Sequence, residues 1–334
     1  MSKPTVKEIV NDINVAFNSE NNLSLSIDPK EDKIIILSDL HRGIKDVKDD
    51  FRNSEKSYIK ALNYYLTHNY RLILLGDIEE LWENNNFEQI NQKYPEVYSL
   101  EKQFFDRNEQ FPNTYIRCYG NHDYRYAYKH WISKDFGINS SHYLKGIKIY
   151  EGIKLELKMA FDSMHFYITH GHQGHYKRDE STISKPRITL WGKFQKVLSS
   201  FTKNGFYTNQ SVFQEPLLRK SDRKMTKEGF LTWAMKNKKS VIYGHTHEAV
   251  FKSKRILDGQ VIHINQLESN TNSSYSSYNT GCCSYKDGVI TGIEIANNKI
   301  RLIFWNEKSR FPETIQFNDD SSLFAEMRFE EFEI

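Results

Sequence analysis

The sequence has few cysteines, and this shortage limits the possible classes of protein. Its 334 residues include three cysteines, an odd and low count that provides no disulfide framework. Cys282 and Cys283 are adjacent, which is poor geometry for a bond between them. These observations favour a reducing setting and predict a cytoplasmic protein without disulfides.

The sequence also lacks long hydrophobic runs and a strong net charge. No apolar run reaches the roughly 18 residues of a membrane span, so we expect no transmembrane segment. Residues 1–17 lack the apolar core of a signal peptide and predict an amphipathic helix instead. The formal net charge of +3 gives no global field typical of a nucleic-acid binder.

Short β-type runs alternate with helical stretches in the first part of the chain. Apolar β patterns occur at residues 33–39, 71–77 and 113–120, and helical patterns at 51–70 and about 86–110. This alternation predicts parallel strands covered by helices. From residue 148 onward, consecutive strands follow with little helix between them. We therefore predict an α/β (α+β) fold, a two-layer mixed β-sandwich flanked by helices.

Five polar clusters follow apolar runs, at the points where strands should end. They are SDLHRG (38–43), LGDIEELW (75–82), YGNHDY (119–124), THGHQGH (169–175) and YGHTH (243–247). In open α/β sheets, binding sites gather beyond the carboxyl ends of strands. We therefore expect these loops to converge on one edge of the sheet. Their His, Asp and Asn side chains would suit a divalent cation of borderline hardness.

Each cluster alone has an ordinary structural explanation. An Asp-Leu-His segment and a Gly-Asp turn both occur in many surface loops. Three histidines within six residues, from 170 to 175, are harder to explain by packing. His245 and His247 share one side of an extended chain, since side chains alternate with period two. The joint occurrence of all five clusters indicates one site.

In this order, the clusters resemble the calcineurin-like metallophosphoesterase superfamily. The family pattern D-x-H, G-D, G-N-H-D/E, H, G-H-x-H is complete between about residues 33 and 248. A family-like β tail includes Asn279 and Gly281. The resemblance implies a metallophosphoesterase domain over 31–306. We expect a helical N-terminal extension at 1–30 and a C-terminal extension at 307–334.

The resemblance implies two divalent cations about 4 Å apart. Carried over by motif, Asp39, His41 and His247 would hold the first cation. Asn121, His170 and His245 would hold the second, and Asp77 would bridge both. We expect manganese or iron, while zinc and cobalt are also compatible with mixed nitrogen and oxygen ligands.

The resemblance also implies a reaction. It predicts hydrolysis of a phosphomonoester, a phosphodiester or a pyrophosphate by a hydroxide that bridges the two cations, which lower the pKa of bound water from about 15.7 towards 7. His122 would protonate the leaving oxygen, with Asp123 as its orienting carboxylate. The alternatives are a nuclease acting on single-stranded nucleic acid and a non-catalytic binding scaffold, and the complete ligand set favours the enzyme.

Within the superfamily, the motif wording is closest to the branch of UDP-2,3-diacylglucosamine hydrolases. Arg42 stands where that branch usually has an apolar residue, and His172 where it often has an acid. Arg42 could grip a substrate phosphate or be a solvated loop residue. His172 and His175 could be substrate contacts, extra ligands or hydrogen-bonding loop residues.

A basic and aromatic insertion, about residues 176–235, separates the fourth and fifth clusters. Twelve Lys or Arg and four Asp or Glu lie between Lys177 and Lys227. This composition predicts a helical lid that raises the anion concentration near the metals, or an ordinary basic surface packed on the core. The partner that we expect is an anionic phosphate-containing substrate. Binding of nucleic acid and peripheral membrane contact through the lid are further possibilities.

Overall fold

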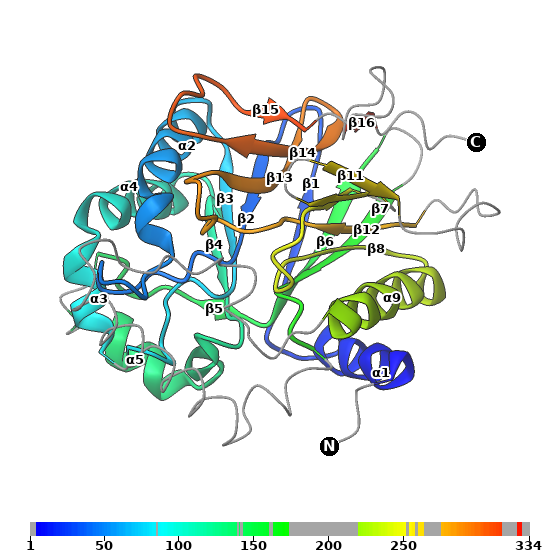
Figure 1. Ribbon diagram of the computed structural model, residues 1–334, viewed down its shortest axis with the longest axis horizontal. Helices are drawn as coiled ribbons and strands as arrows, with labels where there is room; N and C mark the ends of the chain where they lie inside the picture. The colour runs from blue at the N-terminus through cyan, green and yellow to red at the C-terminus, as the bar shows by residue number, and fades with distance from the viewer. Residues whose placement is uncertain are drawn as a thin grey trace.

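The computed structural model describes residues 5–84, 86–138, 140, 143–159, 163–173, 220–251, 254–257, 260–263, 275–315 and 326–328. Two mixed β-sheets face each other, and helices cover their outer faces (Figure 1). The expected two-layer mixed sandwich with flanking helices is therefore confirmed.

The first sheet contains the β-α-β part of the chain, in the strand order β15-β14-β13-β2-β3-β4-β5. Four of its strands run parallel, namely β2 (Ile34–Leu37), β3 (Arg71–Leu75), β4 (Tyr115–Cys118) and β5 (Ile149–Tyr150). The antiparallel side is formed by β13 (Ile290–Ala296), β14 (Lys299–Trp305), β15 (Glu313–Thr314) and β16 (Glu326–Arg328). Both β15 and β16 pair with β14.

The second sheet has the strand order β1-β6-β7-β8-β12-β9-β10-β11. Its first half consists of β1 (Asn22–Ile27), β6 (Gly152–Lys158), β7 (Ser163–Thr169) and β8 (Ser240–Tyr243). Its second half consists of β9 (Val250–Phe251), β10 (Lys254–Leu257), β11 (Gln260–His263) and β12 (Ser277–Asn279). Strands β7, β8 and β12 are parallel neighbours, so the loops after β7 and β8 leave the same edge.

The apolar run of β2 shows why the sequence forms a buried central strand. Ile34 and Ile36 lie in the core between the two sheets, whereas Ile35 and Leu37 pack against the helices on the outer face. Side chains that alternate across a strand buried on both faces produce a continuous apolar run instead of an alternating one.

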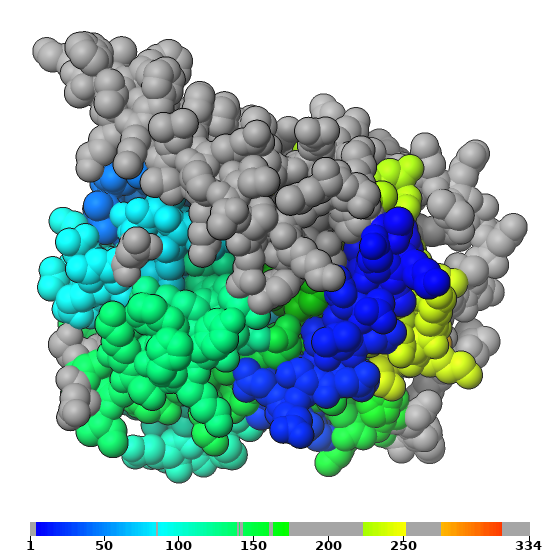
Figure 2. Space-filling model, turned by 90° about the horizontal axis from the view of Figure 1, so that it is seen from below, coloured from blue at the N-terminus to red at the C-terminus, as the bar shows by residue number. Residues whose placement is uncertain are grey.

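Helices cover both outer faces of the sandwich. The first sheet is covered by α2 (Glu55–Thr67), α3 (Phe87–Lys93), α4 (Pro95–Asp106) and α5 (Lys129–Phe136), with short 3₁₀ turns η1 (Phe51–Asn53), η2 (Arg107–Glu109) and η3 (Tyr124–Ala127). The second sheet is covered by α1 (Val6–Phe17) and α9 (Lys220–Asn237), which pack against each other. Figure 2 shows α1 in blue at the surface, beside the yellow-green residues of α9.

The segment before residue 31 was predicted to be helical, but it contains a strand as well as a helix. After α1 it forms β1, which pairs in parallel with β6 and places Leu25 and Ile27 in the core between the sheets. The domain boundaries drawn from the sequence stay predictions. The expected lid lies outside the described residues up to position 219, and the remaining part of that range belongs to α9. In the described part of the chain, no helix is long and apolar enough to cross a membrane.

Candidate metal centre

The loops after five strands, β2, β3, β4, β7 and β8, meet at one edge of the sandwich. Backbone hydrogen bonds tie them together: the N–H of His41 donates to the carbonyl of Asp77 at 2.9 Å, and that of Gly244 to the carbonyl of His170 at 2.8 Å. Each of the seven predicted ligands is at most 5% exposed. Residues separated by about 200 positions in sequence therefore form one buried group, hereafter the candidate metal centre.

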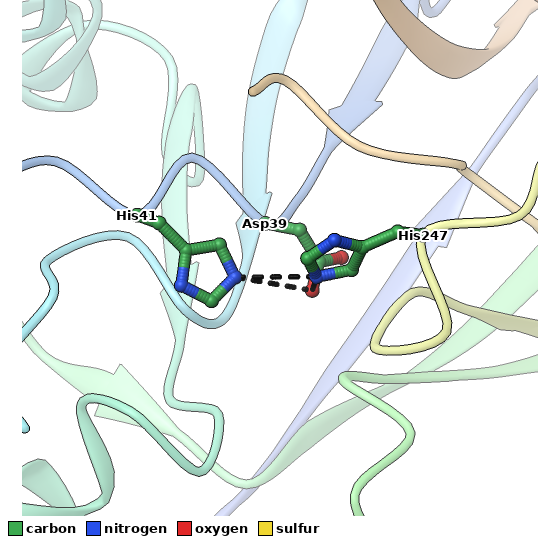
Figure 3. A group of neighbouring side chains, drawn as sticks. All are labelled: Asp39, His41 and His247. Carbon is green, nitrogen blue, oxygen red and sulfur yellow. Dashed lines mark hydrogen bonds and ion pairs between the residues drawn. The ribbon is translucent and has the colours of Figure 1, made fainter. Parts of the chain in front are cut away.

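The first set of predicted ligands is a tight group (Figure 3). Oδ1 of Asp39 lies 3.2 Å from Nε2 of His247 and 3.9 Å from Nε2 of His41. The two imidazole Nε2 atoms are 3.2 Å apart. Three ligand atoms therefore converge on one point, as a coordinated cation requires.

The second set lies beside the first. Oδ2 of Asp77 is 3.1 Å from Nε2 of His170, and His245 belongs to the same group of ligand atoms. Oδ1 of Asn121 lies 3.2 Å from Nε2 of His170. Asp77 Oδ2 is also 3.8 Å from Nε2 of His41, so this carboxylate stands between the two groups.

The backbone of the centre is unusual. Five of the seven predicted ligands have positive φ, between 50° and 65°: Asp39, His41, Asp77, His245 and His247. Such conformations cost roughly 1–2 kcal/mol per non-glycine residue and persist only where the surroundings fix them. At Gly120, a Cβ would lie 2.2 Å from Oδ1 of Asp77. Only a glycine permits the β4 loop to approach Asp77 this closely.

The unpaired carboxylate oxygens show that these residues fit a cation. Oδ2 of Asp39 accepts the backbone N–H of His245 at 3.0 Å, and Oδ1 of Asp77 accepts that of His122 at 2.8 Å. The other two oxygens, Asp39 Oδ1 and Asp77 Oδ2, have imidazole nitrogens as neighbours and no well-aligned hydrogen-bond donor. Buried carboxylate oxygens without donors are rare in native proteins, and divalent cations are suitable partners for them.

The electrostatics of the centre agree with this fit. Burial opposes ionisation of Asp39, but the imidazoles of His247 and His170 lower its pKa to about 2. Burial alone would lower the pKa of His170, yet Asp77 and Asp39 raise it to about 10. His170 also donates from Nδ1 to the carbonyl of Leu75 at 2.8 Å, which leaves Nε2 as the coordinating nitrogen.

A glutamate, not the expected aspartate, orients His122. Nδ1 of His122 lies 2.6 Å from Oε2 of Glu80, and the same oxygen lies 3.1 Å from Nδ1 of His41. Burial opposes ionisation of Glu80, but His122 and His41 lower its pKa to about 2. The ring of Trp82 stacks on that of His122, with centroids 4.1 Å apart. His122 is thus fixed from two sides.

Asp123 has a different task from the one predicted for it. Its carboxylate accepts backbone N–H groups of Gly120 at 2.6 Å, Ile78 at 3.0 Å and Asp77 at 3.3 Å. It therefore joins the loops after β3 and β4 instead of contacting the imidazole. Sequence reasoning missed Glu80, although the acidic pair in GDIEELW, directly after a buried strand, was an available signal.

Arg42 also differs from the expectation that it binds substrate phosphate. Its side chain is fully buried. Nη1 lies 3.0 Å from Oε1 of Glu101 and Nη2 lies 3.6 Å from Oε1 of Glu79, while the guanidinium stacks 4.4 Å from the ring centre of Tyr98. Two carboxylates and an aromatic ring hold the guanidinium beneath the helices, so it is neither a solvated loop residue nor a group facing the metal centre.

His172 lies close to the centre, but its role stays a prediction. It is 3% exposed, and its ring centre lies 5.5 Å from that of His170 and 6.1 Å from that of Tyr124. His175 lies outside the described residues.

Comparisons with known proteins extend these observations. The calcineurin-like phosphoesterase family matches residues 32–249. This match is to the whole family, so the narrower branch named above stays a prediction. No curated protein matches the chain.

Three solved structures resemble the chain at low identity. A mutant cold-active protein tyrosine phosphatase has 16% identity and a TM-score of 0.33, with 89% of this chain and 84% of that chain covered. A dimetal phosphatase from Danio rerio has 12% identity and a TM-score of 0.39, with 86% and 99% covered. Vacuolar protein sorting 29 from Cryptosporidium parvum has 11% identity and a TM-score of 0.33, with 89% and 98% covered.

Proposed function

The chain belongs to the calcineurin-like phosphoesterase family, and from this premise we propose that it hydrolyses phosphate esters at the candidate metal centre. It is a metal-dependent phosphoesterase, whose substrates contain phosphate. The observation that carries the proposal is the set of three overlapping Asp/His groups, which contain the unsatisfied oxygens Asp39 Oδ1 and Asp77 Oδ2.

The two sets of predicted ligands would be divided between two cations. Asp39, His41 and His247 would hold the first, and Asn121, His170 and His245 the second, with Asp77 shared between them. Asn121 supplies a neutral oxygen. A carboxylate in its place would add negative charge and weaken the pull of the cations on the substrate.

When bound, two such cations would neutralise the charge of the phosphate ester and lower the pKa of water, so that a nucleophile is available near neutral pH. The side chains of the protein would supply the proton for the leaving oxygen. Nδ1 of His122 points to Glu80, so Nε2 is the nitrogen that would give its proton to the leaving oxygen. A positioned acid of this kind typically accelerates a reaction by about 10²–10⁴-fold.

We propose manganese or iron as the metal, and zinc or cobalt is compatible with the same mixed nitrogen and oxygen ligands. We also propose a cytoplasmic setting, which is supported by three unpaired, buried cysteines.

The substrate could be a phosphomonoester, a phosphodiester or a pyrophosphate, including the lipid-linked sugar nucleotides of the branch named above. Single-stranded nucleic acid as the substrate and peripheral membrane contact through the lid are proposals of the same kind. These alternatives differ in the bond that is broken, so they can be separated by a choice of substrates.

The first test compares hydrolysis of bis-p-nitrophenyl phosphate and p-nitrophenyl phosphate by the full chain. We expect turnover with added Mn²⁺ and none with chelator. Absence of turnover of either ester with manganese, iron, zinc or cobalt would favour a non-catalytic scaffold. Cleavage of the diester without cleavage of single-stranded DNA or RNA would exclude the nuclease.

The second test separates proton donation from metal binding. His122→Asn should keep the cation content of the wild type but lose about 10²–10⁴-fold in turnover. His130→Asn, at an exposed histidine on α5, is the matched control and should behave as the wild type. Full activity of His122→Asn would remove this imidazole from the mechanism.

A further inference from the structure

The loop after β8 carries two predicted ligands in a conformation that it cannot hold alone. His245 has φ of 65° and His247 has φ of 55°. Left-handed backbone at two non-glycine residues so close together persists only where neighbouring groups determine it. The contacts that hold this loop therefore decide where the two imidazoles point.

Three contacts hold the loop from the side of β12. The side-chain amide of Asn279 donates to the carbonyl of Gly244 at 2.7 Å and to Oγ1 of Thr246 at 3.1 Å. The hydroxyl of Tyr285 donates to the carbonyl of His247 at 2.9 Å. All three contacts reach the loop from the segment that begins at β12.

Ion pairs with α9 also hold the loop. Glu248, the residue directly after His247, is 1% exposed. Its Oε2 contacts Nζ of Lys227, which is 8% exposed, and its Oε1 lies 3.6 Å from Nε of Arg223. Arg223 and Lys227 are four residues apart, so they lie on one face of α9, one turn from each other.

The helix that supplies these cations is itself fixed. Phe230 of α9 stacks on Tyr243 at the end of β8, with ring centres 4.3 Å apart and planes 5° apart. A Cβ at Gly229 would lie 2.4 Å from Ile9 of α1, so the two helices are in close contact. Figures 1 and 2 show α9 beside α1, and both helices pack on the outer face of the second sheet. The ion pairs thus connect the loop to a rigid support.

We propose that Glu248 is a positioning residue, and that its ion pairs with Lys227 and Arg223 fix the backbone of His245 and His247 for cation binding. This inference rests on the proposed function. Moving two charges out of water is costly, so a pair buried to this extent contributes little net stability compared with apolar residues of the same size. The ion pair would therefore contribute mainly by fixing the geometry of the loop, and less by stabilising the fold.

The test measures cation affinity without using catalysis. The metal-free full chain is titrated with Co²⁺, and binding is followed by visible absorption, which also reports the geometry of the ligands. Lys227→Met should bind Co²⁺ about tenfold more weakly and change the absorption spectrum, since loss of groups that orient ligands typically costs 10–100-fold. Lys227→Arg, which keeps the charge, should stay close to the wild type.

Lys224→Met is the matched control. Lys224 lies on the same helix and forms an ion pair at 3.7 Å with Glu228, but its side chain is 73% exposed. We expect its removal to leave both the affinity and the spectrum unchanged.

A double variant separates positioning from stability. Lys227→Met leaves Glu248 without its nearest cation, so the single change should also destabilise the fold. Adding Glu248→Gln removes the carboxylate charge, which Arg223 at 3.6 Å only partly compensates, and should restore most of the unfolding free energy, measured by urea denaturation in chelator. The Co²⁺ affinity should stay about tenfold weaker. Recovery of affinity and stability together would overturn the proposal.

Each further outcome has a distinct meaning. If Lys227→Met does not fold, Arg223→Gln, which keeps Lys227, takes its place and should weaken Co²⁺ binding by a smaller factor. Unchanged affinity in that variant would overturn the proposal as well. If the wild type binds no cation, the proposed function fails. If the wild type binds two cations and every variant matches it, only the role of Glu248 is wrong.

Discussion

Two groups of fully buried charges in the described part of the chain are neutralised in different ways. The candidate metal centre places Asp39 and Asp77 among histidines. The second group, hereafter the ion cluster, lies under α2 and α4 and consists of Arg42, Glu79, Glu101, Arg117 and Asp123. In the ion cluster the protein supplies its own permanent cations.

The difference indicates why one group needs an external cation. A guanidinium stays charged in any protein environment, so Glu79 and Glu101 are always compensated. An imidazole can lose its proton, and in the described structure no lysine or arginine pairs with Asp39 or Asp77. A divalent cation can therefore bind at the metal centre, whereas in the ion cluster the arginines already compensate the carboxylates.

We expect the largest effect from a substitution that disrupts the metal centre. Asp77→Asn keeps the shape of the side chain but removes the charge shared by both ligand groups. We expect loss of cation binding and a fall in turnover of about a thousandfold, which corresponds to about 4 kcal/mol of transition-state stabilisation. The measurements are metal content and hydrolysis of the phosphate esters named above.

Stability should respond weakly to the same change. The neighbouring imidazoles can release protons when the carboxylate charge is gone, so Asp77→Asn should cost less unfolding free energy in chelator than any charge deletion in the ion cluster. A large loss of stability would show that Asp77 serves the fold, as the ion cluster does.

The second prediction breaks the ion cluster. Glu101→Gln removes the carboxylate that accepts from Arg42, from Tyr58 at 3.0 Å and from Tyr115 at 2.9 Å. Arg42 would keep only the longer contact to Glu79 at 3.6 Å, and a buried guanidinium cannot discharge, so we expect a loss of about 3 kcal/mol in unfolding free energy. Cation content of the folded protein should be unchanged. Glu96→Gln, at an exposed position of α4, should stay within about 0.5 kcal/mol of the wild type.

The ion cluster also illustrates which contacts could not be predicted from the sequence. The strand ends and their polar residues could be predicted, because apolar runs and ligand spacing are local patterns. Arg42 could not be placed, since its partner Glu101 lies 59 positions away on a helix, with no pattern that links the two. Likewise, Glu79 and Glu80 are neighbours in sequence, yet one belongs to the ion cluster and the other contacts His122.

The same limit applies to the sheet order. β1 pairs with β6 across about 130 residues, and the apolar alternation in residues 22–27 is too short to indicate a strand without that partner. Of the two side chains that hold the β8 loop from the β12 segment, Asn279 was singled out only by the resemblance, and Tyr285 was not singled out at all. Contacts of this kind depend on packing between distant elements, which a single sequence does not encode as a local pattern.

A third prediction tests Glu80, which contacts His122 and directly follows Glu79 of the ion cluster in sequence. Glu80→Gln should lower turnover about tenfold to a hundredfold, because His122 loses the carboxylate that fixes its ring. The change should appear in kcat, with KM and cation content close to the wild type. Glu80→Asp should recover part of the rate, and Glu88→Gln on the exposed face of α3 should have no effect. A fall in cation content instead would assign Glu80 to His41.

The smallest expected effect removes one hydroxyl from the ion cluster. The hydroxyl of Tyr98 donates to Oε1 of Glu79 at 2.9 Å, and its ring carries the guanidinium of Arg42. Tyr98→Phe keeps the ring and deletes the hydrogen bond to a charged group, which should cost about 1.5 kcal/mol in unfolding free energy. Tyr128→Phe, at a side chain that is 52% exposed, is the control. Because Arg117 still pairs with Glu79, turnover and Co²⁺ affinity should not change. A loss of either would mean that the two buried groups are coupled and that the ion cluster also tunes the metal centre.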